Sequence, residues 1–357
     1  MNSHGVPVQL SAPGNRSNGR LGWVDYARGI AILLVVYRHC LVGLRRAGVD
    51  VPGSLYAVQE FLYNVRMPVF FVLSGIFLTT SLRKSSTRTV AGKKAASLLY
   101  PYFIWSVFLI SLQWLLSDYT NSSRSAKDYL YILLQPRELD HMWYLLALFN
   151  TTLLYLLLKP LLDNKPLLHT ALAVALHFLS FYLGPWSFFS DIAYHYIFLV
   201  CGVLAADTVM QWESVSSGKA LLYLLGLTPV FVAGQLFWLR TVGPEYQTEN
   251  WWGLGPYLLI ILIACLVYYL VSRLIQAWGY MKWLAEIGKH SLYIYILHIH
   301  VIAFVRIAFV KFAGNTNPLL ILLVSLVTGI LLPVLFYKVS RRFGWSFLFT
   351  APKFRKA

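Results

Sequence analysis

The feature that most constrains the fold of this chain is a series of apolar runs, each about as long as one membrane-spanning helix. Such a helix needs about 20 mostly apolar residues. Runs of this kind lie at 24–43, 58–80, 96–116, 143–161, 166–184, 191–209, 219–239, 254–273, 288–310 and 318–338. Only 12% of the 357 residues are charged, against about 25% in soluble domains, which excludes an ordinary cytosolic enzyme. We therefore expect an all-α, polytopic membrane protein with about ten transmembrane helices.

The distribution of positive charge predicts the orientation of these helices, because Lys and Arg collect in cytoplasmic loops. With the N-terminus inside, 19 of the 30 Lys and Arg residues fall in inner segments, 7 in outer segments and 4 within the runs. Both termini are then cytoplasmic, and the net charge of +16 reflects topology rather than binding to nucleic acid. We expect a disordered cytoplasmic tail at 1–20, a membrane domain at 21–340 and a basic cytoplasmic tail at 341–357.

The first apolar run contains a dense group of polar residues, namely Asp25, Arg28, Arg38 and His39. Arg28 and His39 are eleven residues apart, which on a helix places them within about 20° of one another and about 16 Å apart along the axis. Asp25 precedes Arg28 by three residues and can pair with it. The spacing predicts a cation near the inner mouth of a cavity and an imidazole, the usual general base near neutral pH, deep on the same wall.

Four arginines lie within the predicted spans: Arg28, Arg38, Arg66 and Arg306. An arginine at mid-span costs about 2.5–3.5 kcal/mol on insertion scales, so each needs a reason. One interpretation is that Arg28 extends to the inner headgroups while His39 bonds a neighbouring helix. The number of cations favours a second interpretation, because the four arginines have few acidic partners at similar depth. Asp25 and Glu60 are the plausible ones. Unpaired buried cations indicate an anionic ligand, such as the phosphates of a cofactor or of a lipid-linked substrate.

Other polar and small residues favour packing over chemistry. Ser74-Gly75 is typical of close contact between membrane helices. His298 and His300 are two residues apart, which suits no metal-binding face of a helix, so we expect no metal. Trp143 and Tyr144 begin the fourth run beside His141, at the predicted outer surface; an interfacial aromatic belt and a surface that stacks on sugar rings are equally open interpretations.

Five segments, in order along the chain, resemble the motifs of the family 3 integral-membrane acyltransferases. The first carries the family pattern of Arg, ten residues, then His. The segments are Asp25–His39, Met67–Gly75, Tyr100–Trp105, His141–Leu145 and Ile287–His298. Each alone is a weak match, but five in register on a chain with about ten spans are specific.

The resemblance implies a membrane O-acyltransferase with a ten-helix core. Such enzymes take an acyl group, commonly acetyl, from cytoplasmic acyl-CoA and place it on a hydroxyl of an exported glycan. The chain looks most like the branch of fucose-4-O-acetylases and exopolysaccharide acetyltransferases. We therefore expect a bacterial inner-membrane protein that uses acetyl-CoA as donor and a glycan, free or polyprenyl-linked, as acceptor. The sequence does not predict the acyl group, the acceptor or the oligomeric state.

On this interpretation His39 is the catalytic base, and Arg66 or Arg38 stabilises the developing oxyanion. The residues expected to hold the CoA phosphates are Arg28, Lys93, Lys94 and Asp25. Many family members have Arg-x-x-Arg where this chain has Lys93-Lys94-Ala95-Ala96, so the phosphates would meet point charges rather than bidentate groups. The residues expected to bind the acceptor substrate are His141, Trp143, Tyr144 and His298.

Two other functions are compatible with many spans and buried cations. A transporter or flippase for lipid-linked sugars predicts Gly- and Pro-interrupted helices in symmetric halves, but Pro68 and Gly75 have no counterpart in the second half. A non-catalytic partner of a polysaccharide assembly complex needs neither the register of Arg28 and His39 nor the basic loop at 83–94. The acyltransferase explains all of these features together.

Overall fold

The computed structural model describes residues 21–119, 124–184, 186–212, 215–243 and 250–352, and every regular element in these ranges is a helix. Nine described segments are long and apolar enough to cross a membrane. They are α1 (Gly22–Arg46), α2 with α3 (Gly53–Phe61, Arg66–Lys84), α4 with η1 and α5 (Thr87–Lys94, Ala95–Leu99, Tyr100–Leu115), α6 (Trp143–Leu162), α8 (Ser187–Gln211), α9 (Ser217–Thr241), η5 with α10 (Trp251–Gly253, Leu254–Trp278), α12 with η6 (Ser291–Ile307, Ala308–Phe312) and α13 (Pro318–Arg342). The expected all-α, polytopic fold is confirmed. The tail predicted at 1–20 lies outside the described residues.

The predicted run at 166–184 forms a shorter helix, α7 (Pro166–Leu179). The helix ends at Leu179. Beyond it the hydroxyl of Ser180 donates to the carbonyl of His177, and tight turns follow as far as Gly184. The remaining elements are the amphipathic helix α11 (Lys282–Lys289) and the short turns η2 (Ala126–Ile132), η3 (Pro136–Glu138) and η7 (Trp345–Leu348).

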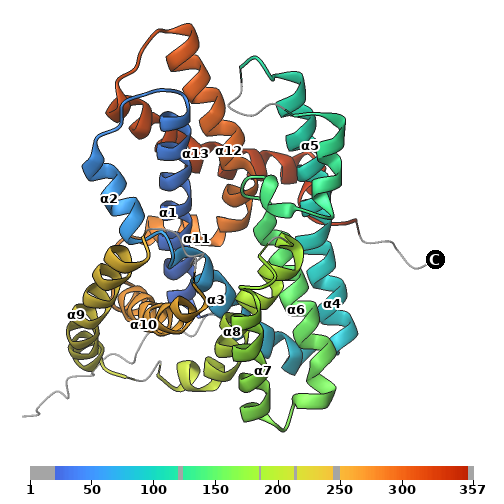
Figure 1. Cartoon of the computed structure of the whole chain (residues 1–357), viewed down its shortest axis with the longest axis vertical. Coiled ribbons are helices and arrows are strands. Elements are labelled where there is room, and N and C mark those ends of the chain that lie inside the picture. Colours follow the sequence, from blue (N-terminus) through green and yellow to red (C-terminus); the bar gives the residue numbers. More distant parts are fainter. Residues whose placement is uncertain (1–20, 120–123, 185, 213–214, 244–249, 353–357) are drawn as a thin grey trace, which may run out of the picture.

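Helix α1 runs through the middle of the bundle and contacts α3, α10, α11, α12 and α13 (Figure 1). Two glycine pairs permit the closest approaches. A Cβ at Gly29 would lie 2.2 Å from the carbonyl oxygen of Leu284 on α11, and one at Gly288 would lie 1.7 Å from the carbonyl oxygen of Asp25. Between α3 and α8, a Cβ at Gly75 would lie 2.2 Å from the carbonyl oxygen of Leu199. The packing predicted for the Ser74-Gly75 pair is therefore confirmed for its glycine.

The second span is broken between α2 and α3, and its backbone is satisfied by other helices. The side chains of Asn64 and Gln235 bond each other at 2.8 and 3.1 Å, and Gln235 also donates to the carbonyl of Phe61. The hydroxyl of Tyr257 donates to the carbonyl of Asn64 at 3.0 Å. Irregular backbone at membrane depth is tolerated where such partners exist, and this break turns Tyr63 and Arg66 toward the interior.

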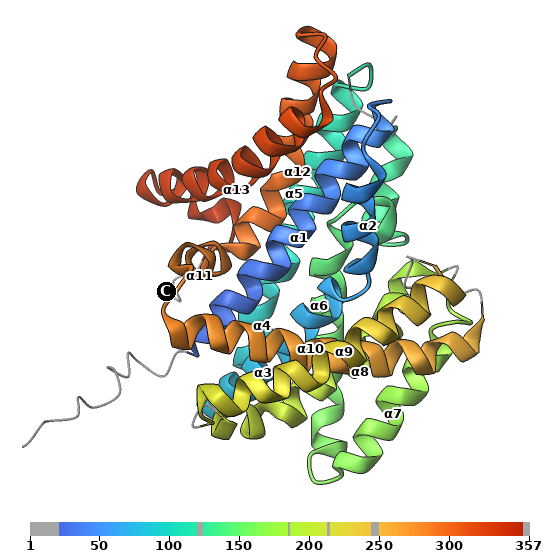
Figure 2. The ribbon, with the colours of Figure 1, turned by 90° about the vertical axis from the view of Figure 1, so that its left-hand side faces the viewer.

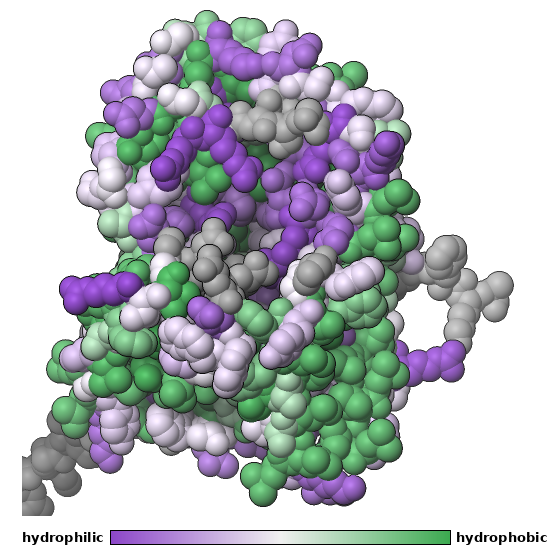
Figure 3. Space-filling view, in the orientation of Figure 1, coloured by the Kyte–Doolittle hydropathy of each residue, from purple (hydrophilic) through white to green (hydrophobic). Residues whose placement is uncertain are grey.

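The outside of the bundle is apolar where it would meet lipid. Helix α9, at the edge of the bundle in Figure 1, exposes Leu222 and Leu225, and α13 exposes Leu323 and Leu331. In the same orientation, hydrophilic side chains gather over the middle and upper part of the visible face, and hydrophobic ones cover much of its lower part (Figure 3). The polar gathering suits a face that meets water rather than hydrocarbon.

The described chain begins and ends at the same end of the bundle, the left-hand side of Figure 2. The amide of Ala351 donates to the carbonyl of Ala96 at 3.1 Å, and Nε1 of Trp105 donates to the carbonyl of Leu348 at 2.8 Å. The boundary predicted at 340 thus falls inside α13, and the segment up to 352 packs on the third span instead of leaving the bundle as a tail. Which end faces the cytoplasm stays a prediction.

Candidate active site

A basic cavity opens beside the N-terminal half of α1. Its cations are Arg28 from α1, Lys94 from α4 and Lys289 from α11. No carboxylate belongs to the described lining, which also includes Ser74, Tyr144 and Tyr295. The guanidinium of Arg28 lies 4.7 Å above the centre of the Phe77 ring, a contact that stabilises the cation.

A central cavity lies further along the same helix. His39, Arg38 and Val35 line it from α1, and Arg66 lines it from the start of α3. The opposite wall consists of Arg137, His141, Trp143, His195 and Tyr295. The space that water-sized molecules can occupy is about 260 Å³ in the basic cavity and about 200 Å³ in the central one.

Tyr295 lines both the basic and the central cavity, so the two cavities are neighbours. Its hydroxyl donates to the carbonyl of His141, and its ring centroid lies 5.2 Å from that of Tyr144. Arg28 and His39 thus line neighbouring cavities, and the roles that their spacing suggests stay predictions. The arrangement can hold an anionic group at one end and a reacting group at the other.

His39 and His141 line the central cavity, and the buried His298 packs against both of them. The ring centroids of His39 and His298 are 5.2 Å apart, those of His141 and His298 are 5.1 Å apart, and those of His39 and His141 are 6.2 Å apart. The described residues contain no group of three or more side chains placed to hold a metal ion.

Hydrogen bonds define the protonation of two of these rings. Nδ1 of His298 lies 2.9 Å from the carbonyl oxygen of Ile294 and 2.8 Å from that of Tyr295. Because a carbonyl only accepts, Nδ1 carries the proton, and Nε2, which has no partner among the described residues, holds the lone pair. Nε2 of His141 donates to the carbonyl of Ile296 at 3.3 Å. Burial, with a smaller contribution from His298, holds the pKa of His141 well below its ordinary value, so this ring is neutral at neutral pH.

The arginines of the central cavity differ in how firmly they are held. The buried guanidinium of Arg66 donates to the carbonyls of Tyr63 and Leu34 at 3.2 and 3.1 Å. The guanidinium of Arg38 lies 4.4 Å above the Tyr63 ring, and its buried Nε has no partner in the described part of the chain. Arg38 therefore has donor capacity to spare, whereas Arg66 is largely committed to the backbone.

The structure moves three of the predicted residues away from the cavities. Lys93 is exposed, with Nζ 3.4 Å from the hydroxyl of Ser85, because adjacent residues on α4 point about 100° apart and only Lys94 can face inward. His298 is fully buried and lies behind His39 rather than at the surface of a cavity. Asp25 is buried where α1 meets α11 and lines neither cavity; its pairing with Arg28 stays a prediction.

The aromatic pair at the start of α6 is not an interfacial belt. His141 and Tyr144 are 2% and 6% exposed, because the turn that precedes α6 folds back into the bundle. Trp143 lines the central cavity and stacks beneath the guanidinium of Arg137, which lies 4.2 Å from its ring centre. Tyr144 lines the basic cavity instead.

Sequence reasoning missed an ion pair that supports the central cavity. Nε of Arg137 donates to the carboxylate of Asp191 at 2.7 Å, and the side chain of Asp191 is 3% exposed. Nδ1 of His195 donates to the carbonyl of Asp191 at 2.9 Å, and its ring stacks on Phe71 at 4.4 Å. The available signal was an acidic residue and a histidine at positions i and i+4 within an apolar run.

Comparison with known proteins now identifies the family. A family model described as "Acyltransferase domain" matches residues 21–338. The chain belongs to this acyltransferase family. The resemblance of the five motifs is thereby confirmed, and the transporter and non-catalytic alternatives give way to an enzyme that transfers acyl groups.

Two curated relatives are similar to parts of this acyltransferase. A nodulation protein NolL of Mesorhizobium japonicum is 34% identical over 110 residues, which cover 30% of this chain and 29% of that protein. A nodulation protein NolL of Sinorhizobium fredii is 27% identical over 209 residues, which cover 57% of this chain and 54% of that protein. The chain thus aligns with about half or less of the length of these relatives. No solved structure matches it.

Four of the five motif segments of the acyltransferase line the two cavities. The first supplies Arg28 and His39. The side chains that the other three supply are Met67, Pro68, Phe70 and Ser74; His141, Trp143 and Tyr144; and Lys289, Ser291, Leu292, Tyr293 and Tyr295. The segment at 100–105 does not. The hydroxyl of Tyr102 donates to the carbonyl of Ile132 at 2.6 Å, so this segment anchors the turns before α6.

Proposed function

We propose that this multi-pass membrane acyltransferase moves an acyl group, normally acetyl, from acyl-CoA to a sugar hydroxyl of an exported or lipid-linked polysaccharide in the inner membrane of a bacterium. The observation that carries the proposal is the pair of neighbouring cavities along α1. Arg28 and two lysines line one of them, His39 lines the other, and Tyr295 lines both.

The basic cavity suits the phosphates of the donor. Arg28, Lys94 and Lys289 approach it from three different helices, and several phosphate groups need several positive charges. Lys289 takes the place that the sequence suggested for Lys93. From Arg28 to His39 the axis of α1 rises about 16 Å, a path suited to an extended pantetheine arm that passes Tyr144 and Tyr295.

His39 acts as the general base in this proposal. Its ring accepts the proton of the sugar hydroxyl while that oxygen bonds to the thioester carbonyl carbon. The carbon–sulfur bond then breaks, and the proton held by His39 passes to the departing thiolate. Such proton transfer contributes about 10²–10⁴ to the rate. The uncommitted donors of Arg38 are the better candidate for stabilising the oxyanion, with Arg66 as a fixed positive charge behind them.

The experiment is loss of the gene followed by NMR of the exported glycan. We expect O-acetyl signals to disappear and to return with the wild-type chain but not with His39→Ala. His290→Ala is the matched control, because His290 lines neither cavity. An unchanged glycan, or full activity of His39→Ala in membranes that contain equal amounts of protein, contradicts the proposal.

A further inference from the structure

A third cavity, here called the lateral cavity, lies between α1, α5 and α12. Its walls are mostly aliphatic and aromatic and include Leu109, Leu112 and Phe304. His39 lines both this cavity and the central one, and so does Asp140. The lateral cavity therefore reaches the proposed catalytic base along a largely hydrocarbon surface, which favours an apolar ligand over a free sugar.

Two guanidinium groups stand on the lining of the lateral cavity. Arg46, at the end of α1, has a side chain that is 60% exposed. Arg306 comes from α12, and its Nη1 lies 3.4 Å from the carbonyl oxygen of Gly43. Asp140 is the one carboxylate of the described lining. Two cations thus face a single acidic group.

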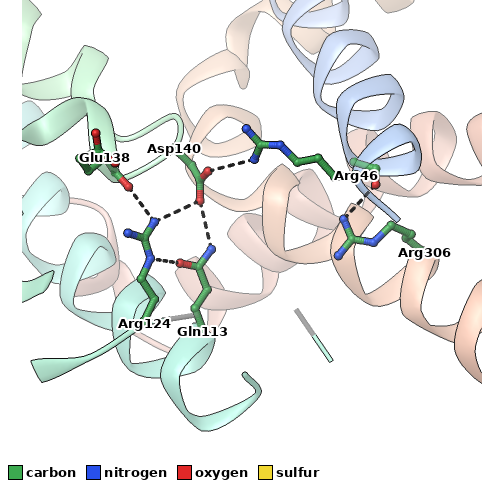
Figure 4. Close-up of polar contacts among 7 residues, drawn as sticks. Arg46, Gln113, Arg124, Glu138, Asp140 and Arg306 are labelled. Atoms are coloured by element: carbon green, nitrogen blue, oxygen red, sulfur yellow. Dashed lines mark hydrogen bonds and ion pairs between the residues drawn. The ribbon is translucent and has the colours of Figure 1, made fainter. Parts of the chain in front are cut away.

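The carboxylate of Asp140 is already used by other donors (Figure 4). Nε2 of Gln113 donates to it at 3.0 Å, and a guanidinium nitrogen of Arg124 lies 3.8 Å away. Arg46 lies 3.9 Å from the other oxygen, at the limit of an ion pair. The two guanidinium groups therefore leave a net positive charge at the cavity, which complements an anionic group.

A buried histidine also points to a ligand. His300 lines the lateral cavity and is 9% exposed, and neither of its ring nitrogens has a hydrogen-bond partner among the described residues. Its ring lies among aromatic side chains, with centroids 5.4 Å from Phe108 and 5.8 Å from Trp105. A buried imidazole without partners is costly, which a polar ligand group would remedy.

We propose that the lateral cavity binds the acceptor as a sugar joined through a diphosphate to a polyprenyl chain. The apolar walls hold the isoprenoid, while Arg46 and Arg306 bind the diphosphate and His300 supplies a further hydrogen bond. The sugar then reaches His39 and the central cavity. This inference rests on the proposed function, since it names the acceptor class of the same site.

The test is equilibrium binding to the full chain in phosphatidylcholine nanodiscs, without acyl-CoA. The probe is radiolabelled farnesyl diphosphate, with farnesol and inorganic diphosphate as competitors. We expect farnesyl diphosphate to bind and both competitors to displace it weakly. Arg46→Gln and Arg306→Gln should each raise its dissociation constant about tenfold, and Arg46→Lys should retain most of the affinity.

Arg45→Gln is the matched control. Arg45 is adjacent in sequence, but its guanidinium lies over the Tyr56 ring at 5.1 Å and does not line the cavity. If Arg306→Gln does not fold, Arg46→Gln decides, because its side chain is largely exposed. Equal binding of farnesol, equal displacement by inorganic diphosphate, or unchanged affinity of Arg46→Gln each overturns the inference.

The two proposals fail separately. Binding is measured without donor, so a chain that binds farnesyl diphosphate but transfers no acyl group leaves this inference standing and refutes the proposed function. A chain that acetylates a water-soluble glycan but does not bind farnesyl diphosphate gives the opposite result.

Discussion

The imidazole rings of His39 and His298 are tilted by 56° with their centroids 5.2 Å apart. Nδ1 of His298 donates to two carbonyls of its own helix, and Nε2 has no hydrogen-bond partner among the described residues. We propose that His298 is a positioning residue that acts through the neighbouring ring of His39 rather than a substrate ligand.

The variant His298→Asn tests this role. Asn can still donate to the backbone carbonyls but lacks the second ring nitrogen, so kcat should fall about ten- to a hundredfold, within the range that proton transfer contributes. The KM for acyl-CoA should change less than about twofold, and the pH–rate profile should shift. Wild-type kcat with an unchanged profile would show that His298 is only a packing residue; His290→Asn controls for loss of a histidine elsewhere.

The two neighbouring lysines of α4 should differ in their effect on donor binding. Lys94 lines the basic cavity, whereas Lys93 points to Ser85. Lys94→Gln should raise the KM for acetyl-CoA about tenfold, because it removes a charge-assisted contact to phosphate, and Lys93→Gln should change it less than about twofold. Lys289→Gln should raise the KM less than Lys94→Gln does, because Lys289 is already paired with Glu286 at 2.9 Å.

Steady-state kinetics on the three lysine variants measure this difference. The dependence of KM on salt should weaken only where a cavity lysine is lost. Equal effects of Lys93→Gln and Lys94→Gln would mean that the phosphates lie outside the basic cavity.

The glycine after Arg28 should be intolerant of any side chain. A Cβ at Gly29 would lie 2.2 Å from a backbone oxygen of α11, so Gly29→Ala must push the two helices apart and move Arg28. We expect a loss of about 1–3 kcal/mol in stability, with a raised KM for acyl-CoA.

Gly92→Ala is the matched control for this contact. A Cβ at Gly92, in helix α4, would meet no atom within 4 Å, so alanine there should stabilise by about 0.5–1 kcal/mol through its higher helix propensity. Thermal unfolding in detergent measures both variants. Equal stability of Gly29→Ala and wild type would disprove the close approach of α1 and α11.

Two arginine–aspartate pairs in the described part of the chain, one largely buried and one exposed, should differ in their contribution to stability. The side chain of Asp191 is 3% exposed and that of its partner Arg137 is 22% exposed. Removal of one partner costs about 3–5 kcal/mol for a fully buried pair, which is an upper bound here. Asp207 pairs with Arg83, and the two side chains are 60% and 52% exposed, where such a pair contributes about 0–1 kcal/mol. Asp191→Asn should therefore lower the melting temperature markedly and Asp207→Asn hardly at all. Similar shifts for both variants would rule out a supporting role for Asp191 beneath the central cavity.

Local patterns in the sequence are enough to predict the class of fold and the core of the candidate site. Hydropathy over about 20 residues indicates a span wherever it occurs, and helical periodicity alone brings Arg28 and His39 to one side of α1. Hydropathy and helical periodicity depend only on residues within a few helical turns of one another, so neither requires knowledge of neighbouring helices.

Other features were decided only when the helices packed together. Lys289 lines the same cavity as Arg28 because α11 packs against α1 through Gly29 and Gly288. Lys94 rather than Lys93 faces inward because of the rotation of α4. Arg137 pairs with Asp191, which lies 54 residues away along the chain. Which residue meets which across a bundle depends on helix rotation and depth, and those follow from close packing between segments far apart in sequence, which no single segment encodes.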